Sequence, residues 1–164
     1  SPELWPQLEN GLKLATQYLA KAIVRDGEGA NCLIQVNVKG AQSCSQALKV
    51  ARTICSSSLV KAAIHGCDPN WGRIIAAAGR AGISINIDKV SLWLGPYQLM
   101  RAGVPLKFDA DLASSYLKDC QNGDYLVDDS VLIDLILGDD IGHASAWGCD
   151  LSYEYVRINA DYTT

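Results

Sequence analysis

The chain has no excess of positive charge, because 14 lysines and arginines stand against 18 aspartates and glutamates, for a net charge of −4. A nucleic-acid-binding domain carries a basic footprint, so this balance excludes that class of partner. No apolar run approaches the roughly 20 residues that a helix needs to span a bilayer, and we expect no membrane contact. The chain also has no internal repeat, linker or low-complexity tract, so residues 1–164 are expected to form a single domain.

Cys-x-x-Cys pairs are absent as well, although the chain has six cysteines. They are spread along the sequence at Cys32, Cys44, Cys55, Cys67, Cys120 and Cys149. At this chain length, such spacing indicates reduced and mostly buried thiols in a reducing compartment. The spacing of His65, Cys67 and Asp68 matches no common zinc site, so we expect no metal.

The composition itself is that of a globular domain, with 49% hydrophobic and 20% charged residues. Ser1, Pro2 and Glu3 are typical of a helix start rather than of a signal peptide, because they suit the cap, the first turn and the positive end of the helix dipole. Apolar residues then recur at helical spacing, at Leu4, Leu8, Leu12, Ala15, Leu19 and Ala22. This pattern predicts an amphipathic helix that ends near Arg25.

Strand and helix patterns alternate after this helix. Cys32–Val38 is predicted to be a strand with one buried and one polar face, and Gly40 ends it. The remaining predictions are a helix over Ser43–Ser56, a strand over Leu59–Ile64, a helix with Asp68 as its N-cap, a strand over Val90–Leu94, a hairpin or bent strand over Tyr97–Phe108, a helix over Asp109–Lys118, a strand over Val131–Leu137, a loop over Gly138–Asp150 and a strand over Leu151–Ile158. This order predicts an α/β layered domain, in which a mixed sheet is packed with helices.

The stretch Asp26–Asn31 (DGEGAN) places one carboxylate, that of Glu28, between two glycines at the junction of the first helix and the first strand. Gly27 and Gly29 can adopt positive φ angles, so the chain can turn sharply and bring its backbone close to a ligand. Two interpretations fit this pattern. One is a helix C-cap followed by a solvated acidic turn, and the other is a carboxylate presented to a cationic group.

Three stretches of the chain resemble one known family. DGEGA at 26–30, LVKAAIHGCDPNWGRI at 59–74 and AWGCDLSYEYVRINADYTT at 146–164 closely resemble the ornithine acetyltransferase family of arginine biosynthesis. Its members are often called bifunctional glutamate and ornithine N-acetyltransferases. The similarity covers essentially all 164 residues, and the three motifs occur in the family's order. By this resemblance the chain is the C-terminal portion of the family's β chain.

The resemblance implies a precursor that cuts itself before a threonine to give an α chain and a β chain. The new N-terminal threonine is the nucleophile, as in other N-terminal-nucleophile enzymes. It takes an acetyl group from N-acetylornithine and passes it to glutamate in a ping-pong cycle through an acyl-enzyme. No cofactor is implied, although acetyl-CoA is a possible further acetyl donor. The implied location is cytoplasmic, or a plastid or mitochondrion in a eukaryote.

This chain departs from the family pattern at the nucleophile. The family's threonine lies in an Ala-Thr-Met-Leu-like context upstream of the first helix, and no such motif occurs here. Thr16 and Thr53 lie in predicted helices, Thr163 and Thr164 end the chain, and Ser1 aligns with an ordinary helix start. The family's oxyanion-hole residues and substrate-binding lysine also belong to other parts of the precursor. We therefore expect no catalytic residue in this chain and no activity from it alone.

Three positions carry over from the family's substrate site. Glu28 matches the substrate-contacting glutamate of DGEGA, and Asn159 and Thr164 match two contacting positions of the C-terminal motif. We expect Glu28 to bind a substrate ammonium, and Asn159 and Thr164 to bind its carboxylate. The implied partners are small amino-acid substrates, the α chain and the remainder of the β chain, in an oligomer of α/β heterodimers. The protein partners would pack on an apolar surface of this chain.

Two other functions fit the sequence. The family is similar in fold to a group of self-cleaving aminopeptidases, which makes an amidase the first alternative, although the INADYTT and DPNWGRI stretches favour the acetyltransferase. The second alternative is a non-catalytic interaction domain. The missing nucleophile favours it, and the three matching site positions favour a part of a larger enzyme.

Overall fold

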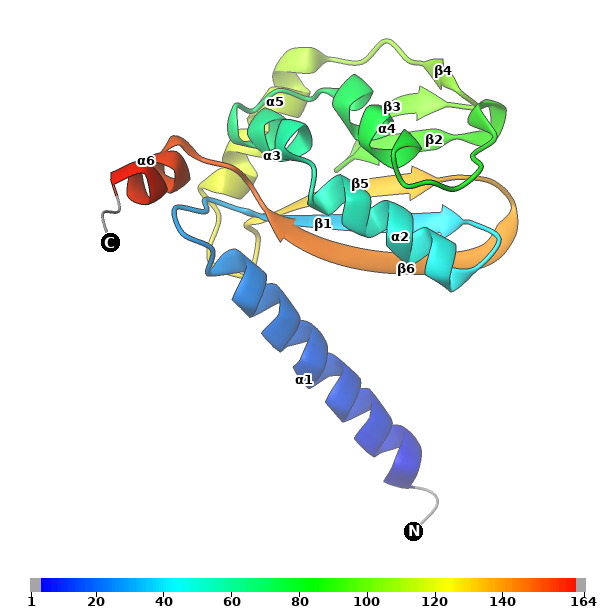
Figure 1. Cartoon of the computed structure of the whole chain (residues 1–164), viewed down its shortest axis with the longest axis horizontal. Coiled ribbons are helices and arrows are strands. Elements are labelled where there is room, and N and C mark those ends of the chain that lie inside the picture. Colours follow the sequence, from blue (N-terminus) through cyan, green and yellow to red (C-terminus); the bar gives the residue numbers. More distant parts are fainter. Residues whose placement is uncertain (1–3, 162–164) are drawn as a thin grey trace.

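A mixed six-stranded sheet forms the centre of the computed structural model, which describes residues 4–161 (Figure 1). The strands are β1 (Leu33–Gly40), β2 (Ser91–Leu94), β3 (Tyr97–Arg101), β4 (Val104–Pro105), β5 (Ser130–Ile136) and β6 (Asp140–Cys149). They lie in the order β4-β3-β2-β5-β1-β6. β1 is parallel to β5 and antiparallel to β6, and the other neighbouring pairs are antiparallel. This arrangement confirms the predicted mixed sheet.

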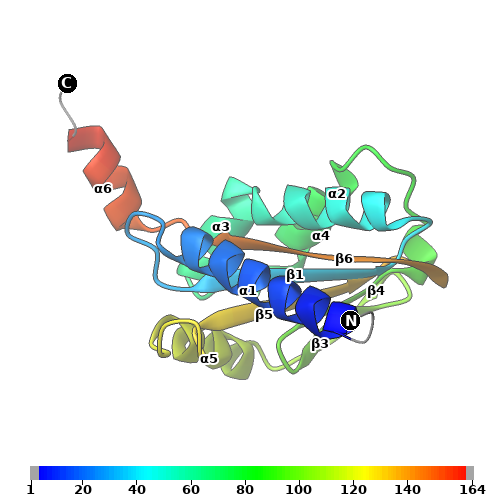
Figure 2. The same cartoon turned by 90° about the horizontal axis from the view of Figure 1, so that it is seen from below.

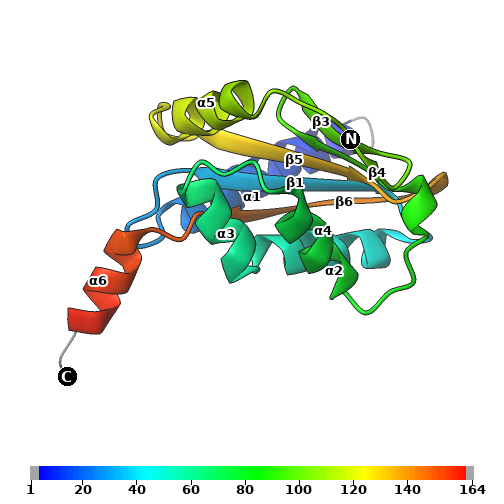
Figure 3. The same cartoon turned by 90° about the horizontal axis from the view of Figure 1, so that it is seen from above.

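Helices lie on both faces of the sheet, which confirms the predicted α/β layers. They are α1 (Trp5–Arg25), α2 (Cys44–Cys55), α3 (Ser58–His65), α4 (Trp71–Gly79), α5 (Ala110–Gln121), α6 (Tyr153–Asp161) and the short 3-10 helix η2 (Ile87–Lys89). Figures 2 and 3 show that α2, α3 and α4 cover one face, whereas α5 lies on the other. α1 and α6 both project from the body of the molecule (Figure 1).

β1 has the alternating pattern that its sequence predicts. Ile34, Val36 and Val38 are fully buried and belong to the same apolar core as Val50 and Ile54 of α2. Burial of an aliphatic side chain of this size contributes about 1.5–3 kcal/mol. The contacts between β1 and α2 are therefore a major source of the stability of the fold.

The opposite face of β1 is polar and is joined to its neighbours by side-chain hydrogen bonds. Trp147 Nε1 on β6 donates to Gln35 Oε1 at 3.0 Å, and Asn37 Nδ2 donates to Asp134 Oδ1 on β5 at 2.8 Å. Ser145 Oγ donates to Asn37 Oδ1 at 2.7 Å. Polar groups on this face thus have partners across three strands.

Two predictions between α2 and α4 are wrong. Leu59–Ile64, predicted to be a strand, lies within α3, because a short apolar run does not by itself distinguish a strand from a buried helix. The N-cap of α4 is Asn70 and not Asp68: Asn70 Oδ1 accepts from Arg73 N at 3.1 Å. The Asp68 carboxylate accepts from Asn70 Nδ2 at 3.0 Å, so it orients the cap instead of forming it.

Two predictions near the C-terminus are also wrong. The segment Gly138–Asp150, predicted to be a loop, contains β6, which pairs with the whole of β1. The segment is rich in small residues and shows no clear alternation of apolar and polar residues, so its strand structure depends on its pairing with β1. Leu151–Ile158, predicted to be a strand, mostly belongs to α6. The cap of this helix is Ser152, whose Oγ accepts from Tyr155 N at 3.0 Å.

α1 has an apolar surface that nothing within residues 4–161 covers. We call this surface the α1 stripe, and it consists of Leu4, Trp5, Leu8, Leu12, Leu19 and Ile23, all more than half exposed. No residue of α1 is buried. The predicted cap residues Ser1–Glu3 lie outside the described residues. A large exposed apolar patch usually marks a surface that packs against another part of a protein or against a partner.

Gly40→Ala is expected to destabilise the fold strongly. Gly40 has a φ of 75°, and a Cβ there would lie 2.0 Å from the carbonyl oxygen of Gly138. A left-handed residue alone costs about 1–3 kcal/mol, and here the neighbouring backbone must also move. Gly79→Ala is the matched control, because its Cβ would meet nothing within 4 Å at the end of α4. Thermal unfolding of both variants measures the difference, and equal midpoints would contradict the expectation.

The cysteines are expected to differ sharply in reactivity. Cys44 is exposed, whereas Cys32 and Cys55 are buried. Burial raises the pKa of Cys55 to about 12, and burial together with the Asp150 carboxylate raises the pKa of Cys32. A raised pKa leaves less of the reactive thiolate at pH 8. A thiol reagent at pH 8 should therefore label Cys44 in the native protein and the two buried thiols only after unfolding. Peptide mass spectrometry tests this, and native labelling of Cys55 as fast as Cys44 would refute it.

Candidate functional site

The turn Asp26–Asn31 joins α1 to β1, as predicted, and α6 packs directly on it. Gly29 has a φ of 66°. A Cβ at this position would lie 2.8 Å from both Ser152 Oγ and Tyr155 N. Contacts this short do not occur in folded proteins, so only glycine lets the first turn of α6 approach. The fold thus brings the start and the end of the described chain together at this turn.

Arg25, the last residue of α1, holds the turn from one side. Its Nη1 donates to Ala30 O at 2.7 Å and its Nη2 donates to Asn31 O at 2.8 Å. Its Nε pairs with the buried carboxylate of Asp129, the residue before β5. Asp129 Oδ1 also accepts from Leu126 N at 3.0 Å. A buried carboxylate is costly unless it is paired and hydrogen-bonded, so Asp129 depends on this arrangement of the turn.

Asp150 holds the turn from the other side. Its Oδ1 accepts from Asn31 N at 2.8 Å and from Cys32 N at 3.2 Å. Its Oδ2 accepts from Asn31 Nδ2 at 3.2 Å and lies 2.9 Å from His65 Nδ1, which donates to it. The Asp150 side chain is fully buried. This carboxylate therefore joins the end of β6 to the start of β1 and to the last turn of α3.

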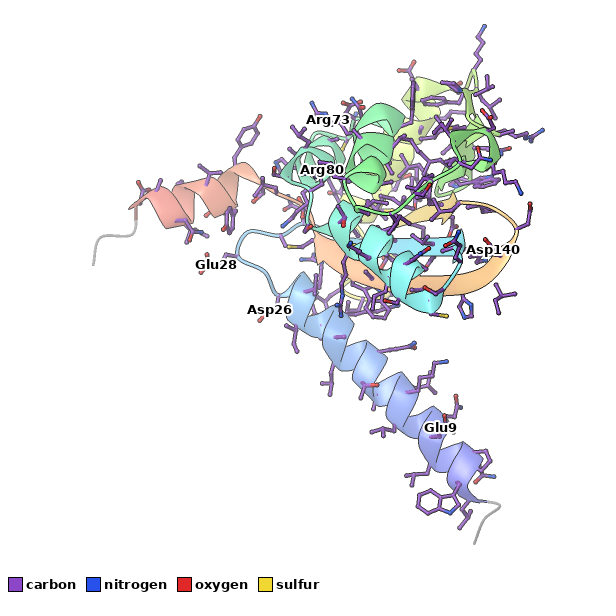
Figure 4. All side chains as sticks on the ribbon, turned by 45° about the vertical axis from the view of Figure 1, so that its right-hand side comes forward. Glu9, Asp26, Glu28, Arg73, Arg80 and Asp140 are labelled. Atoms are coloured by element: carbon purple, nitrogen blue, oxygen red, sulfur yellow. The ribbon has the colours of Figure 1, made fainter. Side chains whose placement is uncertain are left out.

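Glu28 and Asn159, two of the three predicted substrate contacts, meet in the structure although 131 residues separate them. Asn159 Nδ2 donates to Glu28 Oε2 at 2.8 Å and to Tyr155 O at 2.9 Å. Asn159 lies on α6, the helix found where the strand Leu151–Ile158 was predicted. Figure 4 shows Glu28 on the turn between α1 and the body of the molecule. Thr164, the third predicted contact, lies outside the described residues.

A pocket of about 330 Å³ opens beside Glu28. Its lining comes from the turn after α1, the junction of α2 and α3, the end of β6 and α6: Gly27, Glu28, Ser56, Ser58, Lys61, Cys149, Asp150, Leu151 and Tyr155. The volume suits a small molecule. The lining residues include one exposed acid, Glu28, and one base, Lys61, so a ligand that carries charges of both signs suits the pocket.

The described threonines do not lie in this pocket. Thr16 and Thr53 donate their hydroxyls to backbone carbonyls of their own helices, at 2.8 and 2.7 Å, and neither lines the pocket. Ser1, Thr163 and Thr164 lie outside the described residues. The pocket as described has room for a small ligand, but no described threonine lines it.

Two general properties of the described chain bear on cofactors and membranes. Within residues 4–161, no three histidine, cysteine, aspartate or glutamate side chains gather closely enough to hold a metal ion. No helix in the same range has both the length and the apolar character needed to cross a membrane.

Reasoning from the sequence missed four residues that shape the site: Arg25, Asp129, Asp150 and Lys61. Arg25 directly precedes DGEGAN, Asp150 lies inside the C-terminal motif and Lys61 lies inside LVKAAIHGCDPNWGRI. Their places in or beside the three family motifs could therefore have marked them as candidate site residues. Asp129 carried no signal, because its partner Arg25 lies 104 residues earlier in the chain.

Comparison with known proteins shows close relatives over almost the whole chain. The model of the ArgJ family matches residues 2–164. The arginine biosynthesis bifunctional protein ArgJ of Prochlorococcus marinus (strain NATL2A) is 59% identical over 157 residues, which are 96% of this chain and 37% of that protein. The protein of the same name from Synechocystis sp. is 56% identical over 158 residues, covering 96% of this chain and 38% of that protein. The chain thus spans less than two fifths of these relatives.

A solved structure resembles the whole chain. The crystal structure of the arginine biosynthesis bifunctional protein ArgJ from Bacillus halodurans matches it with a TM-score of 0.90 and 43% identity. The match covers 99% of this chain and 73% of that chain. The family model, the identities and the shared fold agree with one another, and they show that the chain belongs to the ArgJ family.

Proposed function

We propose that this chain is the C-terminal part of the β chain of an N-acetyltransferase of arginine biosynthesis. The complete enzyme moves an acetyl group from N-acetylornithine to glutamate through an acyl-enzyme. The rest of the precursor supplies the nucleophilic threonine and the oxyanion hole. This chain supplies one wall of the substrate site, with Glu28, Asn159 and Thr164. Membership of a family whose named relatives act in arginine biosynthesis supports this proposal.

The observation that carries the proposal is the contact between Glu28 and Asn159 at the edge of a pocket. A purely structural acidic turn would leave the Glu28 carboxylate solvated and unoriented. Here Asn159 orients one oxygen of the Glu28 carboxylate. Hydrogen bonds of Arg25 and Asp150 to the backbone of the turn hold it on both sides. A charged group that its surroundings hold in place binds a ligand with little loss of entropy.

The remaining segments of the precursor are the proposed cover of the α1 stripe. This chain covers 37% of a full-length relative but 73% of the chain in the solved structure, so that solved chain is about half as long as the relative. A solved chain of half the full length is what a precursor cut into an α chain and a β chain of similar length would give. In the proposed assembly, both pack against this chain and the α/β heterodimers form an oligomer.

Acetyl-CoA enters this proposal only as a second acetyl donor, and therefore as a substrate and not as a resident cofactor. The proposed location is the cytoplasm, or a plastid or mitochondrion in a eukaryote. The self-cleaving aminopeptidase alternative differs in what accepts the acyl group. Assays of acetyl transfer and of peptide hydrolysis on the complete protein distinguish the two.

The isolated chain is expected not to transfer acetyl groups. An acyl-enzyme requires a nucleophile and an oxyanion hole, and the proposal assigns both to other parts of the precursor. The measurement is turnover of N-acetylornithine with glutamate by the purified chain, beside the complete enzyme as a positive control. Turnover by the chain alone, lost on Ser1→Ala, would show that the chain carries its own nucleophile.

In the complete enzyme, Glu28→Gln is expected to weaken amino-acid binding and to leave self-cleavage intact. The change keeps the shape and the hydrogen bond from Asn159 but removes the charge that would meet a substrate ammonium. A charge-assisted hydrogen bond contributes about 1.5–3 kcal/mol, or roughly ten- to a hundredfold in affinity. Glu9→Gln on α1 is the matched control, because Glu9 lies far from the turn (Figure 4).

Steady-state kinetics and melting temperatures of both variants decide the role of Glu28. Parent-like constants of Glu28→Gln for both N-acetylornithine and glutamate would show that Glu28 is only a turn residue. A collapsed fold would show that it is structural.

A further inference from the structure

Lys61 of α3 lines the same pocket as Glu28, although the two residues belong to different elements of the fold. The backbone of Lys61 is held firmly, because its N donates to Ser57 O at 2.9 Å and its O accepts from Leu151 N at 3.3 Å. Leu151 also lines the pocket. The position of Lys61 is therefore set by the same junction of α3 and the end of β6 that forms the pocket wall.

The amine of Lys61 has no ion pair within residues 4–161. The four ion pairs of that range are Arg25–Asp129, His65–Asp150, Lys89–Asp139 and Arg157–Glu154. The residue is half-buried, and near such a surface an anion pairs with an ammonium more strongly than in open solvent. An anionic ligand group in the pocket would provide that partner.

The other acidic residue of the pocket does not neutralise Lys61. Asp150 is buried and already accepts hydrogen bonds from Asn31, Cys32 and His65. Glu28 has one oxygen bonded to Asn159, and its other oxygen has no hydrogen bond within the described part of the chain. The groups left for a ligand are thus a carboxylate from the turn after α1 and an amine from α3.

We propose that Lys61 binds the α-carboxylate of the amino-acid substrate, while Glu28 binds an ammonium group of the same molecule. This inference rests on the proposed function and adds a specificity residue to it. N-acetylornithine and glutamate both carry an α-carboxylate, so one lysine serves both halves of a ping-pong cycle. Lys61 thus takes the carboxylate-binding role that the sequence predicted for Asn159 and Thr164, because Asn159 already donates to Glu28 and a neutral amide attracts a carboxylate less than an ammonium does.

The test uses the complete self-cleaving enzyme with Lys61→Gln, Lys61→Arg and Lys49→Gln. Lys49 is the matched control, because it is an exposed lysine on α2 outside the pocket. Each variant is assayed with N-acetylornithine and with its α-carboxamide, which lacks the carboxylate charge. Self-cleavage and melting temperature report on the fold.

Lys61→Gln is expected to lower kcat/KM for N-acetylornithine by about ten- to a hundredfold, mainly through KM. It should have much less effect on the carboxamide, so the preference of the enzyme for the acid over the amide shrinks. Lys61→Arg should restore part of that preference, because it restores the positive charge. Lys49→Gln should match the parent in every measurement.

Three results would overturn the proposal. If Lys61→Gln affects the acid and the amide equally, the lysine acts on the shape of the site and not on the carboxylate. If Lys61→Gln matches the parent while Glu28→Gln is impaired, the carboxylate is bound elsewhere and the proposed function stands. If the parent enzyme transfers no acetyl group, the proposed function itself fails.

A variant that does not cleave itself still leaves the inference testable. If Lys61→Gln does not cleave itself, Lys61→Arg decides, because it keeps the positive charge. A preference for the acid over the amide that stays near the parent's in Lys61→Arg supports the contact, and loss of that preference in a folded, self-cleaved Lys61→Arg enzyme counts against it.

Discussion

Two buried carboxylates, those of Asp129 and Asp150, hold the structure around the site together. A buried charge is tolerated only when hydrogen bonds and an ion pair replace the water that it has lost. Arg25 and Leu126 N supply those partners for Asp129, and His65 with the backbone N–H groups of Asn31 and Cys32 supply them for Asp150. Removing one partner of a buried pair typically costs about 3–5 kcal/mol. The end of α1, the starts of β1 and β5 and the end of β6 are therefore fixed relative to one another.

The site follows from this constraint. Because the turn is held on both sides, the backbone of Glu28 has a fixed position. Gly29, which has no side chain, leaves the space in which the first turn of α6 packs. α6 in turn brings Asn159 to Glu28. The pocket beside them gains its amine from α3, whose last turn is tied to Asp150 through His65. One set of buried charges thus positions acidic and basic side chains that are far apart in the sequence.

Local patterns predicted most of the fold where they were strong. The length of α1, the alternation of β1 and the helix predicted over Asp109–Lys118 are properties of short segments, and the structure confirms them. The errors occurred where a tertiary partner decides. α3 was read as a strand because its apolar run is short, and β6 was read as a loop because its pairing with β1 is visible only in the sheet.

The sequence by itself determined the family and the mixed α/β fold class, and it predicted Glu28 and Asn159 as site residues, because each of these rests on a contiguous motif. Only the tertiary structure decided that Glu28 and Asn159 touch, that Arg25 and Asp150 clamp the turn and that Lys61 lines the same pocket. The physical reason is that hydrogen bonds and ion pairs depend on distance in space. Partners separated by about a hundred residues leave no periodicity for a single sequence to show.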